Sequence, residues 1–306
     1  MSTRAYVVGV DGSAVSQSAL DWSCAMAQGP DASVRAVHVW GWHHAALDLL
    51  FPGAPTALAA EAQRSVDKQV EQAMANHPGR EPHARPEGSV VEGETASTLL
   101  REARGADLLV LGRDGRGSWA RRVARPALGS VVGHVLSQAR MPVAVIPPNA
   151  ASAAPRRIVV GVDGSQTSGG ALRWAVAQGL ALHVPVTAVL TWQLTSLPSP
   201  MAAHVGGTMP PMSDWAAWAD ELLDTAVQHS LGSDGTGIER VVLHRPASAG
   251  LLESVRTDDL LVLGDRGRGG FDRLLLGSVT RQCVEHASCP VVVVPFEQRS
   301  EEQPDS

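Results

Sequence analysis

The sequence has few of the features that mark several large classes of protein. Its 306 residues include three cysteines, Cys24, Cys283 and Cys289, with no CxxC pair and no metal-ligand spacing. We therefore expect neither a disulfide framework nor a metal site. No apolar run approaches the roughly eighteen residues of a membrane span, and the first residues, MSTRAYVVGVDGS, lack a charged-then-apolar signal segment. We expect a cytoplasmic protein without a membrane partner.

An excess of positive charge is also missing. The chain has 25 basic and 31 acidic residues and a net charge of −6, which argues against a nucleic-acid-binding protein. Lys68 is the only lysine, and no GxxxxGK[S/T] phosphate loop occurs. The GxSxG nucleophile motif is absent. The sequence therefore contains no credible covalent catalyst.

The chain is internally duplicated. VVGVDGS occurs at residues 7–13 and again at 159–165, and ADLLVLG at 106–112 corresponds to DDLLVLG at 258–264, both at an offset of 152. The pairs Gly129-Ser130 and Gly277-Ser278 correspond at an offset of 148. The first copy therefore has four extra residues between Gly115 and Gly129.

The duplication predicts two domains, residues 1–147 and 157–296. The small, Pro-containing stretch 148–156 is a predicted linker, and the polar stretch 297–306 is a predicted disordered tail. In each domain short apolar runs alternate with helical patterns at residues 14–28, 58–75, 95–104 and 130–139 of the first copy. The predicted strands cover residues 6–10, 34–40, 89–91, 108–111 and 143–146, and then 158–162, 186–191, 239–243, 260–263 and 291–294.

This alternation predicts the α/β class. Apolar strands that alternate with helices form a parallel sheet with helices on both faces, and a five-stranded flavodoxin-like arrangement is the simplest. Ligands bind such sheets beyond the carboxyl ends of the strands. We expect the first and fourth strands to be neighbours there, followed by GVDGS and by the glycine-rich loop.

Two loops at this edge have more than one interpretation. GVDGS at residues 161–165 is either a strand-to-helix turn capped by Ser165 or part of a ligand site. The loop from Gly264 to Ser278 combines the spaced glycines Gly264, Gly267 and Gly277 with Arg266, Arg268 and a helix-opening serine. The N–H groups of a helix N-terminus suit phosphate, whereas the alternative is a flexible surface loop.

In combination these motifs resemble the universal stress protein family in its tandem two-domain bacterial form. VxGxDGS follows the first strand, and Gly264, Gly267, Gly277 and Ser278 match G-x2-G-x9-G-[S/T], the signature of the family's ATP-binding branch. GSVT and CPVVVVP also look like the family, and the resemblance covers nearly the whole chain. It implies two flavodoxin-like (HUP-type) domains that bind ATP, with Mg²⁺ accompanying the phosphates, in a regulator or sensor of stress responses.

The resemblance also implies individual site residues. In the second copy Asp163 and Thr191 would line the adenosine, with Gly161 and Leu263 close by. The ribose and phosphates would be wrapped by Gly264, Asp265, Arg266, Gly267, Arg268, Gly269 and Gly270. The phosphate tail would be held by Gly277, Ser278 and Val279.

In the first copy the corresponding residues are Gly9, Asp11, Val39, Leu111, Gly112, Gly115, Gly129 and Ser130. Thirteen residues separate Gly115 from Gly129, where the signature has nine. Two outcomes are open. The longer loop bulges while Gly129 and Ser130 still hold phosphate, or it blocks the site.

Without a phosphate-loop lysine or a residue to position water, we expect no enzyme, or at most weak ATP hydrolysis. The competing hypothesis is an interaction protein with empty pockets. An adenylate-transferring enzyme would need a motif such as HxGH, which is absent.

The last strands, Val143–Ile146 and Val291–Val294, look like the family's edge-pairing strand. Exposed apolar edges favour aggregation. We therefore expect the two halves to pair, and a homodimer through last-strand edges. The regulatory protein partner is unknown.

Overall fold

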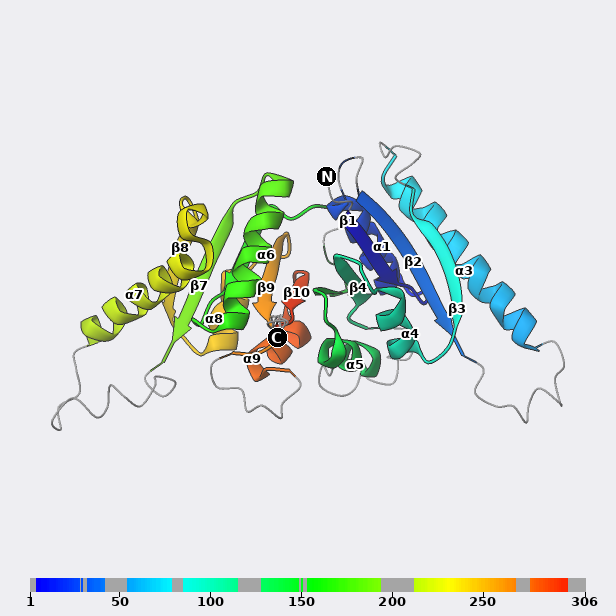
Figure 1. Ribbon diagram of the computed structural model, residues 1–306. Coiled ribbons are helices and arrows are strands. Elements are labelled where there is room, and N and C mark those ends of the chain that lie inside the picture. Colours follow the sequence, from blue (N-terminus) through cyan, green and yellow to red (C-terminus); the bar gives the residue numbers. More distant parts are fainter. Residues whose placement is uncertain are drawn as a thin grey trace, which may run out of the picture.

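Ten strands form one continuous sheet in the computed structural model (Figure 1). The structure describes residues 4–27, 29, 32–41, 54–78, 85–114, 128–148, 150, 153–193, 212–267 and 276–296. The order of the strands is β3-β2-β1-β4-β5-β10-β9-β6-β7-β8. Within each half all strands are parallel, so the predicted α/β class with two doubly wound domains is confirmed.

The elements follow the duplication. The first domain contains β1 (Arg4–Gly9), α1 (Ala14–Met26), β2 (Ala32–Trp40), α3 (Ala54–Asn76), β3 (Glu87–Glu92), α4 (Thr95–Glu102), β4 (Leu108–Gly112), α5 (Ser130–Gln138) and β5 (Val143–Ile146). The second domain contains β6 (Arg157–Gly161), α6 (Gln166–Leu182), β7 (Val186–Trp192), α7 (Met212–Leu231), the short 3-10 helix η5 (Gly232–Gly235), β8 (Glu239–His244), α8 (Ala247–Ser254), β9 (Asp259–Gly264), α9 (Ser278–His286) and β10 (Val291–Val294).

Every predicted strand is present, and the predicted bounds differ from the observed ones by two residues or fewer. Among the helices, the largest difference from the predicted bounds is at the start of α3, which begins at Ala54 and not at residue 58. Pro55 does not end this helix, because it lies in the first turn, where a backbone N–H has no partner within the helix.

The two domains are joined by their last strands. β10 pairs with β5 in antiparallel orientation, with Val291 opposite Val145 and Val293 opposite Val143. The predicted pairing of the two halves is therefore confirmed. The same pairing gives β5 and β10 a neighbour on both sides, so neither has a free edge. The last-strand edges are therefore covered within one chain and are not open to a second copy, whereas association of two chains stays a prediction.

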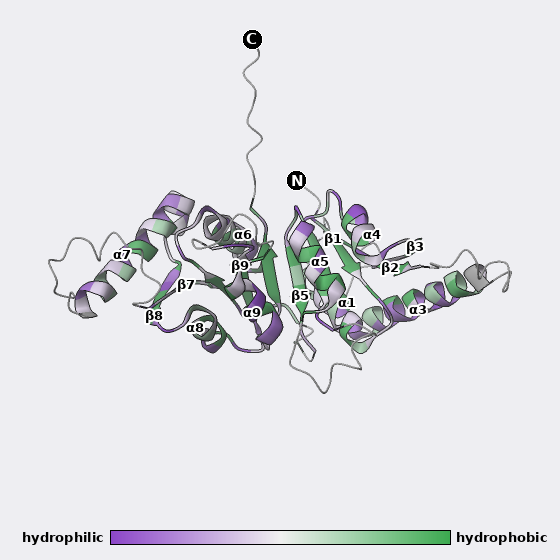
Figure 2. Cartoon of the chain, turned by 90° about the horizontal axis from the view of Figure 1, so that it is seen from below, coloured by the Kyte–Doolittle hydropathy of each residue, from purple (hydrophilic) through white to green (hydrophobic). Residues whose placement is uncertain are grey.

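Each face of the sheet is covered by helices from both domains. α1, α3, α6 and α7 pack on one face and α4, α5, α8 and α9 on the other. Since side chains alternate along a strand, Ala144 and Val292 belong to the first apolar layer, and Val145 and Val291 to the second. Figure 2 shows these hydrophobic strands at the centre of the molecule. Both layers thus continue across the domain junction.

Candidate functional site

The loops with the predicted site residues meet at the carboxyl edge of the sheet. β1 is the neighbour of β4, with Gly9 opposite Leu111, and β6 is the neighbour of β9, with Val160 opposite Val262. The expected adjacency of the first and fourth strands is therefore present in both domains. It brings GVDGS beside the start of the glycine-rich loop.

The DGS turn has a structural role in both domains. In the second, Gly164 has φ 79°, a conformation that favours glycine. One carboxylate oxygen of Asp163, Oδ1, accepts hydrogen bonds from the Ser165 backbone N–H (3.0 Å) and hydroxyl (2.6 Å), and Ser165 caps α6. Gly12, Asp11 and Ser13 repeat this geometry. The interpretation of GVDGS as a helix-capping turn is confirmed.

The other oxygen of Asp163 faces the glycine-rich loop. A Cβ atom built on Gly267 would lie only 2.6 Å from Asp163 Oδ2. Any side chain at residue 267 would therefore displace the carboxylate. Gly264 is similarly constrained, because a Cβ there would lie 3.0 Å from the backbone carbon of Thr167 in α6.

The glycines that end β1 and β6 accommodate leucine side chains. A Cβ atom on Gly161 would lie 2.6 Å from Leu263 Cδ2 and 3.2 Å from Leu251 Cδ2. On Gly9 it would meet Leu111 Cδ2 at 2.7 Å. Because Leu263 and Leu111 are buried in the second apolar layer, their side chains lie in the core and not on a ligand-accessible surface.

Thr191 and Val39 lie one strand away from these glycines, on β7 and β2. Thr191 is half-buried, and its methyl group packs where Gly250 of α8 leaves room for it. Val39 is half-buried against the second apolar layer. Both residues are on the same face of the sheet as α8 and α4.

The N-terminus of α9 is fixed beside the end of β9. The N–H of Gly277 donates to the Asp265 carbonyl (2.8 Å), and the Thr280 hydroxyl donates to the Gly264 carbonyl (2.8 Å). Gly277 is the N-cap residue and supplies no side-chain hydrogen bond, and Ser278 is exposed as the first helical residue. The first-turn N–H groups, including that of half-buried Val279, are thus without a side-chain cap.

The first domain has the same arrangement at α5. Gly129 is its N-cap residue and provides no side-chain cap, and Ser130 is exposed at the first helical position. The two helices therefore begin in the same way, at a glycine without a side-chain cap. Gly115, Arg268, Gly269 and Gly270 lie outside the described residues.

The charges at the two sites differ at the two residues that follow the fourth strand, which are Asp265-Arg266 in the second domain and Arg113-Asp114 in the first. Asp265, which follows β9, is 9% exposed, and its Oδ1 atom has no hydrogen-bond partner in the described part of the chain. Its Oδ2 atom lies 3.6 Å from the Arg266 guanidinium. The residue that follows β4 is Arg113. Each domain thus has one aspartate in the turn, but only the second has another directly after the fourth strand.

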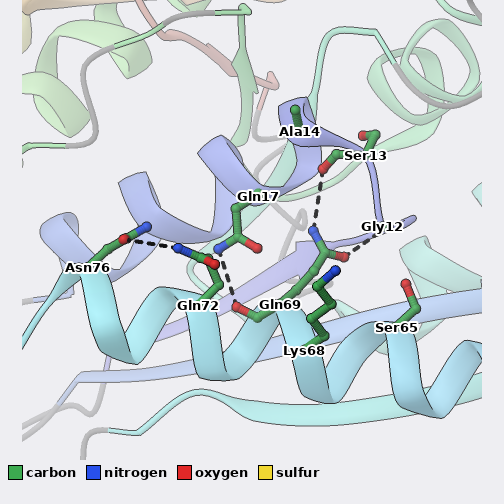
Figure 3. Close-up of a pocket in the computed structure, with 9 residues that line it drawn as sticks. All are labelled: Gly12, Ser13, Ala14, Gln17, Ser65, Lys68, Gln69, Gln72 and Asn76. Atoms are coloured by element: carbon green, nitrogen blue, oxygen red, sulfur yellow. Dashed lines mark hydrogen bonds between the residues drawn. The ribbon is translucent and has the colours of Figure 1, made fainter.

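The sequence did not point to a polar hollow between α1 and α3 (Figure 3). It has a volume of about 340 Å³ and is lined by Gly12, Ser13, Ala14, Gln17, Ser65, Lys68, Gln69, Gln72 and Asn76. Gln69 is buried and accepts a hydrogen bond from the Gly12 N–H (2.9 Å) while donating to the Ser16 hydroxyl (3.0 Å). Its role is to hold the DGS turn of the first domain from α3, a contact 57 residues apart in the chain.

The described residues contain neither a cluster of metal ligands nor a membrane-spanning helix. Over those ranges, no three His, Cys, Asp or Glu side chains come close enough to hold a metal ion. In the same part of the chain, no helix is long and apolar enough to cross a membrane.

Comparison with known proteins agrees with the fold and the motifs. The model of the universal stress protein family matches residues 3–147 and 155–295. A universal stress protein of Mycobacterium tuberculosis is 32% identical, with 95% of each chain covered, and one of Mycolicibacterium smegmatis is 27% identical over 94% of this chain and 96% of that one. The crystal structure of a universal stress protein from Archaeoglobus fulgidus has a TM-score of 0.65 at 14% identity, covering 96% and 97% of the two chains. The chain therefore belongs to the universal stress protein family and contains two tandem copies of the family's domain.

Proposed function

We propose that this protein binds ATP at the carboxyl edge of each domain and that the bound nucleotide regulates a stress response. The observation that carries the proposal is the N-terminus of α9, which begins at a glycine, has no side-chain cap and is tied to the end of β9. Unpaired N–H groups and the positive end of the helix dipole favour phosphate oxygens. A glycine at the N-cap lets the phosphate approach the backbone.

The residues of the second site fit a divalent cation bound together with the phosphates. Mg²⁺ prefers oxygen ligands and is held in proteins by one or two carboxylates together with substrate phosphates. Asp265 has a buried oxygen without a partner in the described residues, and Asp163 has Oδ2 directed to Gly267. These two carboxylates would hold the ion, which would neutralise phosphate charge. The first site has Asp11, and its Asp114 lies 3.7 Å from the Arg113 guanidinium and is 38% exposed, so we expect weaker dependence on Mg²⁺ there.

We propose a binding protein and not a rapid ATPase. Phosphoryl transfer in phosphate-loop enzymes uses a lysine on the terminal phosphates. Lys68, the only lysine, lies on α3 at the hollow beside Gln69. Helix α3 packs on the opposite face of the sheet from α5 and α9. Because Lys68 is the only lysine, the loops at the proposed sites contain arginine but no lysine. At most weak hydrolysis is expected.

One observation favours the alternative, an interaction protein without nucleotide. Leu263 and Leu251 fill the space over Gly161 where the adenosine was expected. If these leucines do not move, the nucleotide base has to bind farther out, towards Thr191. An interaction protein would not require that adjustment, so nucleotide binding has to be measured.

Calorimetric titration of the intact chain with ATP and Mg²⁺ tests the proposal. Two sites per chain are expected for the unaltered protein. Gly277→Arg should remove one, because its side chain would enter the space required by phosphate, and Gly129→Arg should remove the other. Each variant is the control for the other. A Cβ at Gly277 lies 3.3 Å from the Asp265 carbonyl oxygen, and one at Gly129 lies 3.5 Å from that of Arg113, so the fold is retained with slight adjustment. Unchanged stoichiometry in both variants would contradict the site assignment.

A further inference from the structure

Helix α9 is held at its far end by the first domain. The guanidinium of Arg113 donates from Nη1 to the carbonyl oxygens of Ala287 (2.8 Å) and Val284 (3.5 Å). The last carbonyls of a helix have no partner within it, and a cation there also interacts favourably with the helix dipole. Arg113 therefore completes the C-terminal end of a helix that belongs to the other domain.

A second contact joins the same helix to the first domain. The N–H of Leu128 donates to Glu285 Oε1 (3.4 Å), and Glu285 is held in place by an ion pair with Arg281 (2.9 Å). Leu128 directly precedes Gly129, the N-cap residue of α5, and Arg113 directly follows Gly112 at the end of β4. Residues on both sides of the first domain's proposed nucleotide loop thus contact α9.

The helix is suited to transmit displacement between its ends. Its nine residues, at 1.5 Å of rise each, separate the two ends by about 13 Å. Thr280, Cys283 and Val284 are buried, so its inner face is packed along its length. Because packed helices move as units, a shift imposed at Ala287 reaches Gly277 and Ser278.

We propose that α9 couples the two nucleotide sites of the chain. Arg113 and Leu128 act as positioning residues for the phosphate-binding N-terminus of α9, so occupancy of the first site alters the affinity of the second. Thermodynamic linkage requires the second site to affect the first by the same factor. This inference rests on the proposed function, since it concerns the regulation of the same sites.

The residue that corresponds to Arg113 in the second domain cannot make the same contact. Asp265 corresponds to Arg113, and the backbone N–H of each donates to its own last strand, to Val294 (3.0 Å) and Ile146 (2.8 Å). An aspartate carboxylate only accepts hydrogen bonds, so Asp265 cannot satisfy the terminal carbonyls of α5. We therefore assign the proposed coupling to α9.

The test compares ATP binding to the second site with and without Arg113. For each, the affinity of the second site is measured by calorimetry in the full chain, where the first site also fills, and in Gly129→Arg, where the first site stays empty; the ratio of the two affinities is the coupling factor. With Arg113 present this ratio should be about 5-fold or more, the lower end of common coupling effects, and Arg113→Ala should bring it close to 1. Arg113→Gln, which retains a donor, should have a smaller effect and provides a second variant should the alanine variant fold poorly.

Arg35→Ala is the matched control. Arg35 bonds the C-terminal carbonyl of α4 and pairs with Glu102 (2.8 Å) within the first domain. Arg35→Ala also removes an arginine from the C-terminal end of a helix, but this helix, α4, is not part of the proposed phosphate site of the second domain. A coupling ratio within 2-fold of that of the unaltered chain is expected for this variant. Hydrogen exchange of residues 278–286 is the second readout, and it should rise with Arg113→Ala only.

The outcomes separate the two ideas. If the ratio is 1 in the unaltered chain, or if both Arg113 variants keep the ratio of the unaltered chain and exchange in α9 is unchanged, the coupling is refuted and the sites stand. An equal loss for Arg35→Ala also refutes it, because the effect would then be general destabilisation. If the unaltered chain binds no ATP, the proposed function is wrong, and the coupling fails with it.

Discussion

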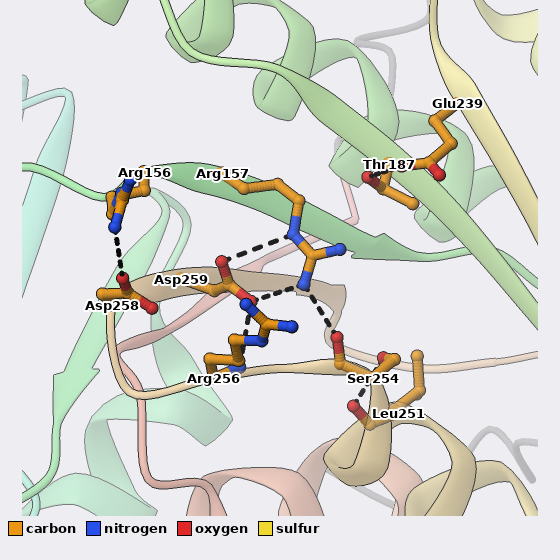
Figure 4. A network of polar contacts seen from close by, with 9 residues as sticks. All are labelled: Arg156, Arg157, Thr187, Glu239, Leu251, Ser254, Arg256, Asp258 and Asp259. Atoms are coloured by element: carbon orange, nitrogen blue, oxygen red, sulfur yellow. Dashed lines mark hydrogen bonds and ion pairs between the residues drawn. The ribbon is translucent and has the colours of Figure 1, made fainter.

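The ion pair of Arg157 and Asp259 allows a sharp test of how the second domain is stabilised (Figure 4). Asp259 is 4% exposed, and its Oδ2 atom accepts hydrogen bonds from Arg157 Nη2 (2.6 Å) and the Arg256 N–H (2.9 Å). Arg157 Nη2 also donates to the Ser254 carbonyl (3.0 Å). This network ties the amino ends of β6 and β9 to the end of α8. The hydrogen bond to Asp259 is the main reason why the pKa of Arg157 is raised above its ordinary value.

Asp259→Ala should cost about 2–3 kcal/mol of unfolding free energy. Breaking a buried pair typically costs about 3–5 kcal/mol, because one charge is left without its partner. The side chain of Arg157 is 30% exposed, so water partly replaces the lost carboxylate. We therefore expect about 2–3 kcal/mol, which is less than the cost for a fully buried pair. At roughly 2–4 °C per kcal/mol for a chain of this size, the melting temperature should fall by about 4–12 °C.

The first domain provides the matched control. Asp107 corresponds to Asp259, but Ala5 stands where the second domain has Arg157. Asp107 Oδ2 accepts a hydrogen bond from the Ala5 N–H (2.7 Å). Asp107→Ala should therefore cost about 1 kcal/mol, the typical value of one hydrogen bond. Scanning calorimetry of both variants decides the matter. Equal losses of stability would refute the reasoning that a stranded arginine makes the difference.

Two further outcomes follow from the structure. Glu94 caps α4, and hydrogen bonds from Ser97 and then Ala96 lower its pKa to about 2. A lowered pKa in the folded state contributes stability above about pH 4.5 that is lost as the pH falls towards 2. Because Glu94 is exposed, this contribution is below about 1 kcal/mol. Between pH 6 and pH 3 the melting temperature should fall more for the unaltered chain than for Glu94→Gln. Equal decreases would contradict a stabilising role of the Glu94 carboxylate as the cap of α4. Separately, a fragment of residues 1–147 should self-associate, since it exposes the β5 edge. A stable monomer on size-exclusion chromatography would count against this.

Strand positions could be predicted from the sequence because their signal is local. Runs such as Val291–Val294 are apolar throughout, and the duplication marks the same elements twice. The pairing of β5 with β10 was also predictable, since two apolar edges in one chain need cover. Its consequence for a homodimer was missed, because one pairing occupies both edges.

The contacts that shape the site could not be predicted in this way. Nothing local to Gly161 indicates that Leu251, 90 residues later in the chain, will pack over it. Gln69 has the position of a core residue in α3, and only the tertiary structure shows that its amide holds Gly12. Arg113 directly follows the fourth strand of the first copy, and only the tertiary structure shows that its guanidinium donates to a carbonyl of the other domain. Sequence motifs predict which backbone elements are repeated, but they do not predict the tertiary contacts of each side chain.

The two copies differ most in function at the residue after the fourth strand. Duplication preserved the backbone there, since the N–H groups of Arg113 and Asp265 make the same contact with the last strand. Their side chains have opposite charges and different tasks. Asp265 remains in its own domain with an oxygen available for a cation, whereas Arg113 leaves its domain for the end of α9. If α9 couples the sites, exchanging these residues should remove the coupling. Arg113→Asp strands the helix carbonyls, and Asp265→Arg places a second cation near the phosphates without restoring the contact. A double variant with intact coupling between its sites would show that the signal takes another route.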